Sequence, residues 1–364
     1  MTCPWTPAPR GGFLQAICPQ LEPLTGLDEG FRQWALRFLE DCYVSNKQEA
    51  TFRESPAAGA PSDARTLYCG LRMLAQLGDS ELFRRVKADR AKIGRKINSF
   101  YNPQLEVYQG NDNHQPDSMG KWHLHDGYLY LPRALKILDL PSKPIAKGLD
   151  KLPRFPWALK KGGSIPAWVK RCTAGNPRSG VKEITQYLAL YRMLGGKMWD
   201  DHIEKIFGQL IALRDPETGF IGRHDDPGWA MRGHRNNILV ITLYEMGIQE
   251  PVDEQLKVIN STLALQRPDG LYHDGSMCAN MDAIQLLAEC TVQTGYLRHD
   301  IRKSIERALA AIVEHLAVPA GGVHYEHPSA SSGQPETLVT GLGFMMESIR
   351  FGKCIGASFT FKRH

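Results

Sequence analysis

The chain of 364 residues repeats one sequence pattern six times, and this repetition constrains its fold more than any other feature. Each copy starts with a polar or glycine-containing loop, continues as an apolar stretch of helical length and ends at a glycine or a turn. One such stretch cannot bury its apolar surface alone, so neighbouring copies are expected to stack into a continuous core. The six copies span residues 62–78, 125–140, 181–195, 235–247, 281–295 and 336–352.

Amphipathic stretches alternate with these apolar ones, at residues 29–45, 80–98, 143–160, 197–214, 252–266 and 299–317. Within 80–98, basic residues interleave with Leu82, Val86 and Ile93, which is the pattern of a helix with one buried stripe and one solvated face. The apolar stretch 238–244 would also suit a strand because it is rich in β-branched residues. We prefer a helix because its counterpart 283–292 has a helix-favouring composition.

The apolar stretches are called dry below and the amphipathic ones wet. Twelve helices that are alternately wet and dry predict an inner ring of dry helices wrapped by an outer ring of wet helices. The predicted fold class is therefore all-α, an (α/α)6 toroid of six helical hairpins. We expect residues 29–352 to form one catalytic or binding domain. Residues 1–28 are expected to be an N-terminal extension packed on its rim, and residues 353–364 a C-terminal tail.

The two kinds of connection differ in length. Turns from a dry to a wet stretch are short, whereas the loops back are roughly 15–25 residues long and rich in Gly, Pro, Trp and His. Long loops usually carry function, and this alternation predicts that all of them emerge on one face. Pro132 interrupts the second dry stretch, and because proline suits only a first helical turn, that helix is expected to begin near Leu131. His125 and Asp126 would then lie on the loop.

Composition excludes several classes of protein. The formal charge of +5 is mild and basic residues occur along the whole chain, so we expect no nucleic-acid partner, although an anionic small molecule or glycan suits it. No apolar run reaches ~18 residues, so no membrane span is expected. The first 23 residues do not resemble a secretory signal, which predicts a cytoplasmic location. The eight cysteines show neither C-x-x-C pairs nor zinc spacing, so we expect reduced structural thiols, no metal and no cofactor; the oligomeric state stays open.

Repeated helical hairpins with loops of the form Pro-Asp-Gly-aromatic resemble the α/α-toroid superfamily, and the resemblance covers residues 29–352. This superfamily includes polysaccharide lyases, unsaturated-uronide hydrolases and sugar 2-epimerases, and more distantly the squalene cyclases and protein prenyltransferases. Gly233-His234 is similar to the pair that opens an inner helix in the epimerases, with Asn237 where they have a carboxylate. The stretch 229–233 is similar to a Trp-Ala-Arg-Gly phrase of the uronide hydrolases, with one residue inserted.

The resemblance to the isoprenoid branch of that superfamily is weaker. The stretch 223–226 is similar to the Asp-x-Asp-Asp acid motif of squalene cyclases, but Arg223 replaces the first aspartate. The surroundings of Cys278 and Asp282 do not reproduce the zinc site of the prenyltransferases.

Four loop clusters carry residues suited to sugar binding and proton transfer. Helix N-termini are electropositive, so a ring of inner helices would attract acidic groups to the same face. The candidate catalytic residues are His125, Asp126, Tyr128, Asp225, Asp226, His234 and Tyr325. The candidate substrate-binding residues are Trp122, Tyr130, Trp229, Arg232, Arg235, Asn236, Asn237, Tyr272, His273, Asn280, Asp282, His324 and His327.

Each cluster also has a structural interpretation. Asp126 or an asparagine of the second cluster would cap a helix, and the tyrosines would pack. Asp63, Glu183 and Glu336 are better explained as acidic residues that stabilise helix N-termini.

The residue types favour a carbohydrate-active enzyme acting on an acidic, uronate-containing glycan or oligosaccharide. In β-elimination, Arg235 with Asn236 or Asn237 would neutralise the carboxylate, and His234 or a tyrosine would take the α-proton. In hydrolysis, Asp126, Asp225 or Asp226 would act as the acid. The alternatives are an enzyme similar to terpenoid cyclases or prenyltransferases, and a non-catalytic glycan-binding toroid.

Overall fold

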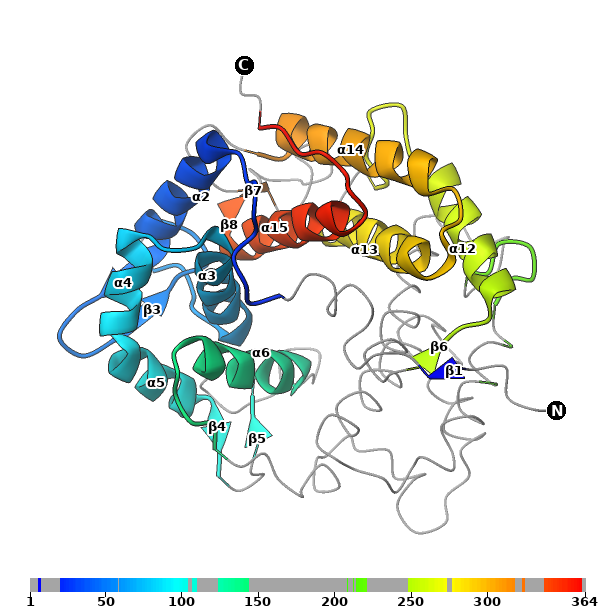
Figure 1. The fold of residues 1–364 in the computed structure, drawn as a ribbon. Helices are drawn as coiled ribbons and strands as arrows, with labels where there is room; N and C mark the ends of the chain where they lie inside the picture. Colours follow the sequence, from blue (N-terminus) through cyan, green and yellow to red (C-terminus); the bar gives the residue numbers. More distant parts are fainter. Residues whose placement is uncertain are drawn as a thin grey trace, which may run out of the picture.

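The described part of the chain is mainly helical, and Figure 1 shows its helices in two concentric arcs. The computed structural model describes residues 6–7, 20–57, 59–103, 107–109, 124–143, 208, 212, 214–220, 248–273, 277–317, 323–324 and 337–361. For 6–7, 107, 124–129, 248–249, 323–324 and 337 this description covers the backbone alone.

The helices are α2 (Glu29–Cys42), α3 (Ala64–Leu77), α4 (Glu81–Ala88), α5 (Arg90–Ser99), α6 (Leu124–Ile137), α12 (Val252–Ala264), α13 (Met277–Thr294), α14 (Arg298–His315) and α15 (Val339–Cys354). The strands are β1 (Thr6–Pro7), β2 (Tyr43–Ser45), β3 (Ala50–Phe52), β4 (Tyr101–Asn102), β5 (Val107–Tyr108), β6 (Ile248–Gln249), β7 (Val323–His324) and β8 (Thr337–Leu338).

The inner arc consists of α6, α3, α15 and α13, which correspond to four of the six predicted dry stretches (Figure 1). Thirteen of the 14 residues of α3 are buried, and so are 14 of the 16 residues of α15. The helical prediction is confirmed for these four stretches; residues 181–195 and 235–247 lie outside the described residues.

The outer arc consists of α5, α4, α2, α14 and α12, and its helices bury only one side (Figure 1). Two of the eight residues of α4 and three of the ten residues of α5 are buried. The alternation of wet and dry helices is therefore confirmed where the chain is described. Among these described helices, none is long and apolar enough to cross a membrane.

Helices α3 and α15 run parallel, with their N-termini on the same side. The Val339 N–H donates to the carbonyl of Glu54, near the start of α3, at 2.8 Å. Further along, Arg72 donates to the carbonyl of Gly343 at 2.8 Å, and Gln76 to the carboxylate of Glu347 at 2.7 Å. The residue numbers in these contacts increase together along both helices, as parallel packing requires.

The predicted single helix over 80–98 is two helices, broken at Asp89. The Asp89 carboxylate accepts hydrogen bonds from the hydroxyls of Tyr43 (2.9 Å) and Ser45 (2.7 Å) and pairs with Lys92 at 2.8 Å. Partial burial of Asp89 opposes ionisation, but the hydrogen bonds from Lys92, Ser45 and Tyr43 outweigh it and lower the pKa of the carboxyl. These bonds to β2 hold the chain at the break between α4 and α5.

The expectation that α6 begins near Leu131 is wrong. The helix starts at Leu124 and contains Pro132 in its interior, so His125 and Asp126 lie in its first turn. A proline inside a helix removes one backbone hydrogen bond and crowds the preceding turn. Burial of Leu131, Ala134 and Leu135 in the core offsets that cost.

Short antiparallel strand pairs, which the sequence patterns did not predict, occupy the loops from outer to inner helices. The pair β2–β3 lies between α2 and α3, β4–β5 between α5 and α6, and β7–β8 between α14 and α15. The reverse turns are short, at residues 78–80 and 295–297, so the predicted difference in loop length is confirmed there.

Both ends of the described chain contact elements that are far away in the sequence. Phe359 and Phe361, beyond the end of α15, pack edge-on against Phe31 of α2 with ring centroids 5.1 and 5.4 Å apart. At the other end, β1 pairs with β6, just before α12.

We predict that Gly70→Ala destabilises the protein, although alanine is ordinarily the better helix former. A Cβ at Gly70 would lie 2.5 Å from Cγ of Phe52, which is buried on β3. We expect a loss of about 1–3 kcal/mol from overpacking, measured by urea unfolding.

Gly94→Ala on α5 is the matched control, because a Cβ there meets a single terminal methyl group of Leu140, at 2.8 Å, which can rotate away. We expect Gly94→Ala to be close to neutral and Phe52→Leu to relieve part of the Gly70→Ala loss. Equal midpoints for the two glycine variants would contradict the proposed close approach.

Candidate functional site

Among the predicted site residues, the structure describes the side chains of Tyr130, Tyr272, His273, Asn280 and Asp282. The predicted site residues that lie outside the described residues are Trp122, Asp225, Asp226, Trp229, Arg232, His234, Arg235, Asn236, Asn237, Tyr325 and His327. The backbone positions of His125, Asp126 and Tyr128 lie in α6, and that of His324 lies in β7. All four are at or next to the start of an inner helix, because β7 pairs with β8, which leads directly into α15.

The third predicted cluster surrounds the start of α13 and forms an ordered hydrogen-bonded corner. The Asn280 side-chain oxygen accepts from the backbone N–H groups of Tyr272 (2.8 Å) and His273 (3.1 Å), and its amide donates to the carbonyl of His273 at 2.9 Å. The Tyr272 hydroxyl bonds to that of Ser304 on α14 at 2.7 Å. Burial raises the pKa of Tyr272 above its usual range. The predicted binding residues Asn280 and Tyr272 therefore hold this loop against α13 and α14, and Asp282 is buried in the same region.

A charged network that the sequence patterns did not predict lies between α3 and α15. The Glu347 carboxylate accepts hydrogen bonds from Arg350 (2.9 Å), Gln76 (2.7 Å) and Gln20 (3.1 Å). Arg72 lies 3.8 Å from the same carboxylate, and the side chains of Glu347, Arg350 and Arg72 are at most 6% exposed. Burial opposes the charge of Glu347, but Arg350 and Arg72 outweigh burial and lower its pKa to about 2.

The same network continues into α6 through aromatic rings. Tyr68 of α3 stacks on Tyr130 of α6 with centroids 4.7 Å apart and planes 9° apart, and Tyr130 is one of the predicted binding residues. The Tyr68 hydroxyl and Arg133 both donate to the side-chain oxygen of Gln20, at 2.9 and 3.2 Å. Gln20 therefore joins α3, α6 and α15, and the network combines charged groups with stacked rings.

A second group of polar residues lies at the N-termini of α3 and α15. The Glu54 carboxylate accepts a short hydrogen bond from the Thr66 hydroxyl and one of 3.4 Å from the Thr340 N–H. Asp63 caps α3 by accepting from the Thr66 N–H at 2.8 Å, which confirms the capping interpretation of this residue. Thr66 thus holds two carboxylates, Glu54 and Asp63, at one helix end.

Burial is the largest influence on Glu54 and raises the pKa of its carboxyl. The nearby negative charge of Asp63 raises it further, while hydrogen bonds from Thr340 and Thr66 oppose the rise. A half-buried carboxyl with a raised pKa is suited to hold a proton and deliver it as a general acid. Glu54 also serves α15 structurally, since the N-cap residue Leu338 makes no side-chain capping bond.

The sequence contains a usable signal for the charged network but none for Glu54. Arg72 and Gln76 are four positions apart in an apolar stretch, and Glu347 and Arg350 are three apart in another. Polar residues spaced along one face of a buried helix would have been a usable signal. Glu54 offered none, because its partner Thr340 is 286 positions away.

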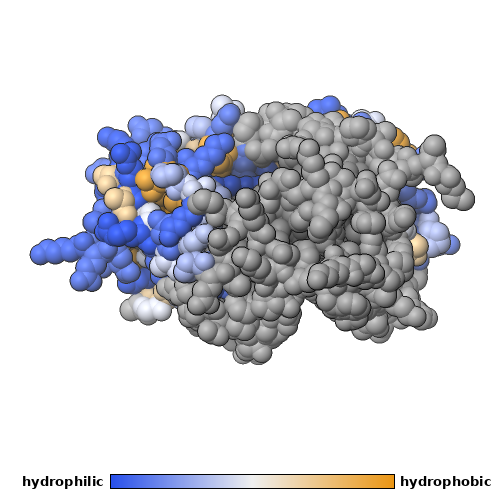
Figure 2. Space-filling model, turned by 90° about the horizontal axis from the view of Figure 1, so that it is seen from below, coloured by the Kyte–Doolittle hydropathy of each residue, from blue (hydrophilic) through white to orange (hydrophobic). Residues whose placement is uncertain are grey.

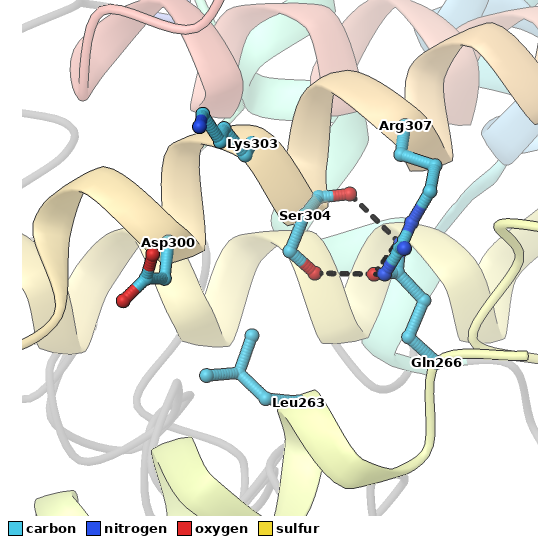
Figure 3. Close-up of a pocket in the computed structure, with 6 residues that line it drawn as sticks. All are labelled: Leu263, Gln266, Asp300, Lys303, Ser304 and Arg307. Atoms are coloured by element: carbon cyan, nitrogen blue, oxygen red, sulfur yellow. Dashed lines mark hydrogen bonds between the residues drawn. The ribbon is translucent and has the colours of Figure 1, made fainter.

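A polar groove of about 400 Å³ lies on the outer arc between α12 and α14 (Figure 3). Figure 3 shows Gln266 bonded to both Ser304 and Arg307: its side-chain oxygen accepts from the Ser304 hydroxyl at 2.7 Å and from Arg307 Nε at 3.1 Å. The Gln266 amide also donates to the backbone carbonyls of Gly270 and Ser304, each at 2.8 Å. Since these polar groups form hydrogen bonds with one another, they hold the end of α12 against α14.

Within the described residues, no cluster of three or more His, Cys, Asp or Glu side chains is arranged to hold a metal ion. In comparisons with known proteins, no family model matches the chain and no curated protein is significantly similar to it.

We predict that Glu347 makes the stability of the protein sensitive to acid. Its folded pKa of about 2 lies below the ordinary value of 4.5, so its contribution to stability is complete above pH 4.5 and is lost as pH falls towards 2. In Glu347→Gln this part of the pH dependence should disappear. At neutral pH the variant should lose about 3–5 kcal/mol, because Arg72 and Arg350 are left buried without a counter-charge.

Urea unfolding at a series of pH values measures both effects. Glu314→Gln, at an exposed position of α14, is the control and should match the parent protein. The same decline between pH 4.5 and 2 in Glu347→Gln as in the parent would refute the assignment.

Proposed function

We propose that the chain is a carbohydrate-active enzyme that acts on an acidic, uronate-containing glycan or oligosaccharide. We further propose that its hairpins close into an (α/α)6 toroid of the superfamily that its sequence resembles. The described inner and outer arcs support this architecture, since they alternate along the chain as a toroid requires (Figure 1). The proposed reaction is either β-elimination or hydrolysis.

The chemistry of the inner arc is the observation that carries this proposal. Helices α3, α6 and α15 carry Arg72, Glu347, Arg350 and the stacked pair Tyr68–Tyr130. Sugar-binding sites combine aromatic faces with a few fixed polar groups. The network has two arginines around one glutamate, so it keeps an excess positive charge that favours an acidic ligand. The isoprenoid alternative would call for an apolar aromatic lining instead.

Two sets of residues are proposed for the chemistry. In hydrolysis, Glu54 would donate its proton to the glycosidic oxygen as the bond to the leaving sugar breaks, while water attacks the anomeric carbon and gives its proton to a second carboxylate. In elimination, Arg235 with Asn236 or Asn237 would hold the uronate carboxylate, and His234 or a tyrosine such as Tyr128 or Tyr325 would remove the α-proton. The carbon–oxygen bond to the leaving sugar then breaks, a carbon–carbon double bond forms, and the leaving oxygen takes up a proton. Glu54 lies at the start of two inner helices, on the side where the candidate loops join them.

The experiment is to incubate the protein with a panel of acidic and neutral glycans. Ultraviolet absorbance reports an unsaturated uronate from elimination, and a reducing-end assay reports cleavage by either route. New reducing ends without absorbance would identify hydrolysis. No product from any glycan, together with turnover of an isoprenoid diphosphate or a squalene-like substrate, would refute the carbohydrate proposal.

We predict that Glu54→Gln lowers turnover by about 10²–10⁴-fold if the reaction is hydrolysis, because the proton donor is lost. Activity of the parent should fall as pH rises through the pKa of Glu54, since the acid must be protonated. This limb of the pH–rate profile should be absent in the variant. In the glutamine the side-chain oxygen can accept from the Thr340 N–H while the amide donates to the Thr66 hydroxyl, so the helix ends should remain intact.

Asp63→Asn is the control, because an asparagine also caps a helix. It should keep the rate at acidic pH and shift the falling limb of the pH profile to lower pH, because it removes the negative charge that helps to raise the pKa of Glu54. A Glu54→Gln variant with a lower melting temperature but an unchanged pH profile would reduce Glu54 to its structural role at α15.

A further inference from the structure

The net positive charge of the protein is concentrated on two outer helices. Basic residues occur along the whole chain, but residues 81–99 hold seven of them and only two acidic residues, a net charge of 7 − 2 = +5. The rest of the chain has 44 − 7 = 37 basic and 39 − 2 = 37 acidic residues, which cancel. The seven basic residues are Arg84, Arg85, Lys87, Arg90, Lys92, Arg95 and Lys96.

This segment consists of α4, Asp89 and α5, and it lies on the outside of the outer arc (Figure 1). The apolar residues Leu82, Val86, Ile93 and Ile97 face the core, which turns the basic residues outward. The exposed ones are Arg84, Arg85, Lys87, Arg90 and Arg95. In Figure 2 the end of the molecule that carries these helices is largely hydrophilic.

Neighbouring acidic groups neutralise only part of this charge. Arg85 pairs with Glu40, Arg84 with Asp79 at 3.7 Å, and Lys92 with Asp89 at 2.8 Å. Within the described part of the chain, Lys87 and Arg90 form no ion pair, and Arg95 reaches only the backbone carbonyl of Gln48 at 3.4 Å. Three exposed cations therefore face solvent without a counter-charge.

We propose that this basic outer surface of α4 and α5 binds an acidic polysaccharide chain, away from the inner arc. The choice of an acidic polysaccharide rests on the proposed function. The two helices are together about 27 Å long at 1.5 Å per residue, long enough to contact several sugar units. A polymer held there would keep its neighbouring segments close to the protein for repeated encounters.

Two other polyanions fit the surface less well. A membrane would need exposed apolar anchors, but the exposed large apolar residues of the described part, Val252 and Leu297, lie on or beside other helices. Single-stranded nucleic acid would need bare aromatic faces for stacking. Here the ring of Phe83 is covered by Lys87 at 4.8 Å, and Phe100 is buried under Lys96.

The test measures binding of the full chain to polygalacturonate, with neutral dextran for comparison, over a series of NaCl concentrations. The variant is Lys87→Gln/Arg90→Gln/Arg95→Gln. Removal of three surface cations should weaken binding by about tenfold to a hundredfold at low salt and reduce its salt dependence. Because these side chains are exposed, circular dichroism should show an unchanged fold.

The control is Arg298→Gln/Arg302→Gln/Lys303→Gln, which removes the same charge from the outer helix α14 and should bind as the parent does. Equal loss in the two triple variants, or no loss in the first, would overturn the proposal. Tighter binding of single-stranded DNA or of anionic phospholipid vesicles than of polygalacturonate at the same salt would overturn it too.

Turnover of a short acidic oligosaccharide separates this proposal from the enzymatic one. The Lys87, Arg90 and Arg95 variant should keep that turnover unchanged, because a short substrate needs no surface outside the active site. Loss of polymer binding in a protein without turnover on any glycan would support the binding surface and refute the enzyme.

Discussion

The buried carboxylate of Glu347 is the interaction on which the inner arc depends. It lies between α3 and α15 and receives hydrogen bonds from both helices and from Gln20. A lone carboxylate at that depth would be protonated or would unfold its surroundings, because desolvation penalises the charge. Arg72 and Arg350 keep it ionised, so the two helices pair in the arrangement that places both arginines beside this carboxylate.

This charge arrangement is possible only because the helices approach closely. Gly343 presents its bare backbone to Arg72, and a Cβ there would lie 3.1 Å from the Cys69 sulfur and 3.2 Å from the Arg72 guanidinium. The carbonyl of Gly343 accepts from the same guanidinium at 2.8 Å. A Cβ at this position would force Cys69 and Arg72 to shift by a few tenths of an ångström and would disturb the hydrogen bond from Arg72 to this carbonyl. Small residues and buried charge are therefore parts of one contact.

Local patterns predicted what local interactions determine. The dry stretch 62–78 became α3 and the wet stretch 252–266 became α12, since apolar spacing and the following turn signals are read within a dozen residues. The break at Asp89 was missed because its partners Tyr43 and Ser45 are 46 and 44 positions away. The start of α6 was misplaced because the local rule for Pro132 ignores the packing of the residues around it. Strands of two or three residues are too short to leave a recognisable alternation in the sequence.

The candidate site also contains residues that local sequence patterns identify and residues that depend on distant contacts. The sequence identified residue types suited to sugar chemistry on the loops, and the described corner around Asn280 binds its own loop rather than solvent. Glu54 could not be found from its neighbours, because the helix end that it serves, at α15, is far away in the chain and its raised pKa comes mainly from burial in the folded protein.

A buried ion network is a poor reagent, since any movement of Glu347 leaves two buried arginines without their counter-charge. The rigid inner arc is better suited to hold a site than to react in it. Glu54 differs in two properties: it is half-buried, and within the described residues its carboxylate accepts hydrogen bonds from Thr66 of α3 and Thr340 of α15. Its proton can therefore be exchanged without a change in the packing of either helix. Chemistry is expected at the helix ends, where the backbone is fixed by the network below and the side chains remain accessible from the loops above.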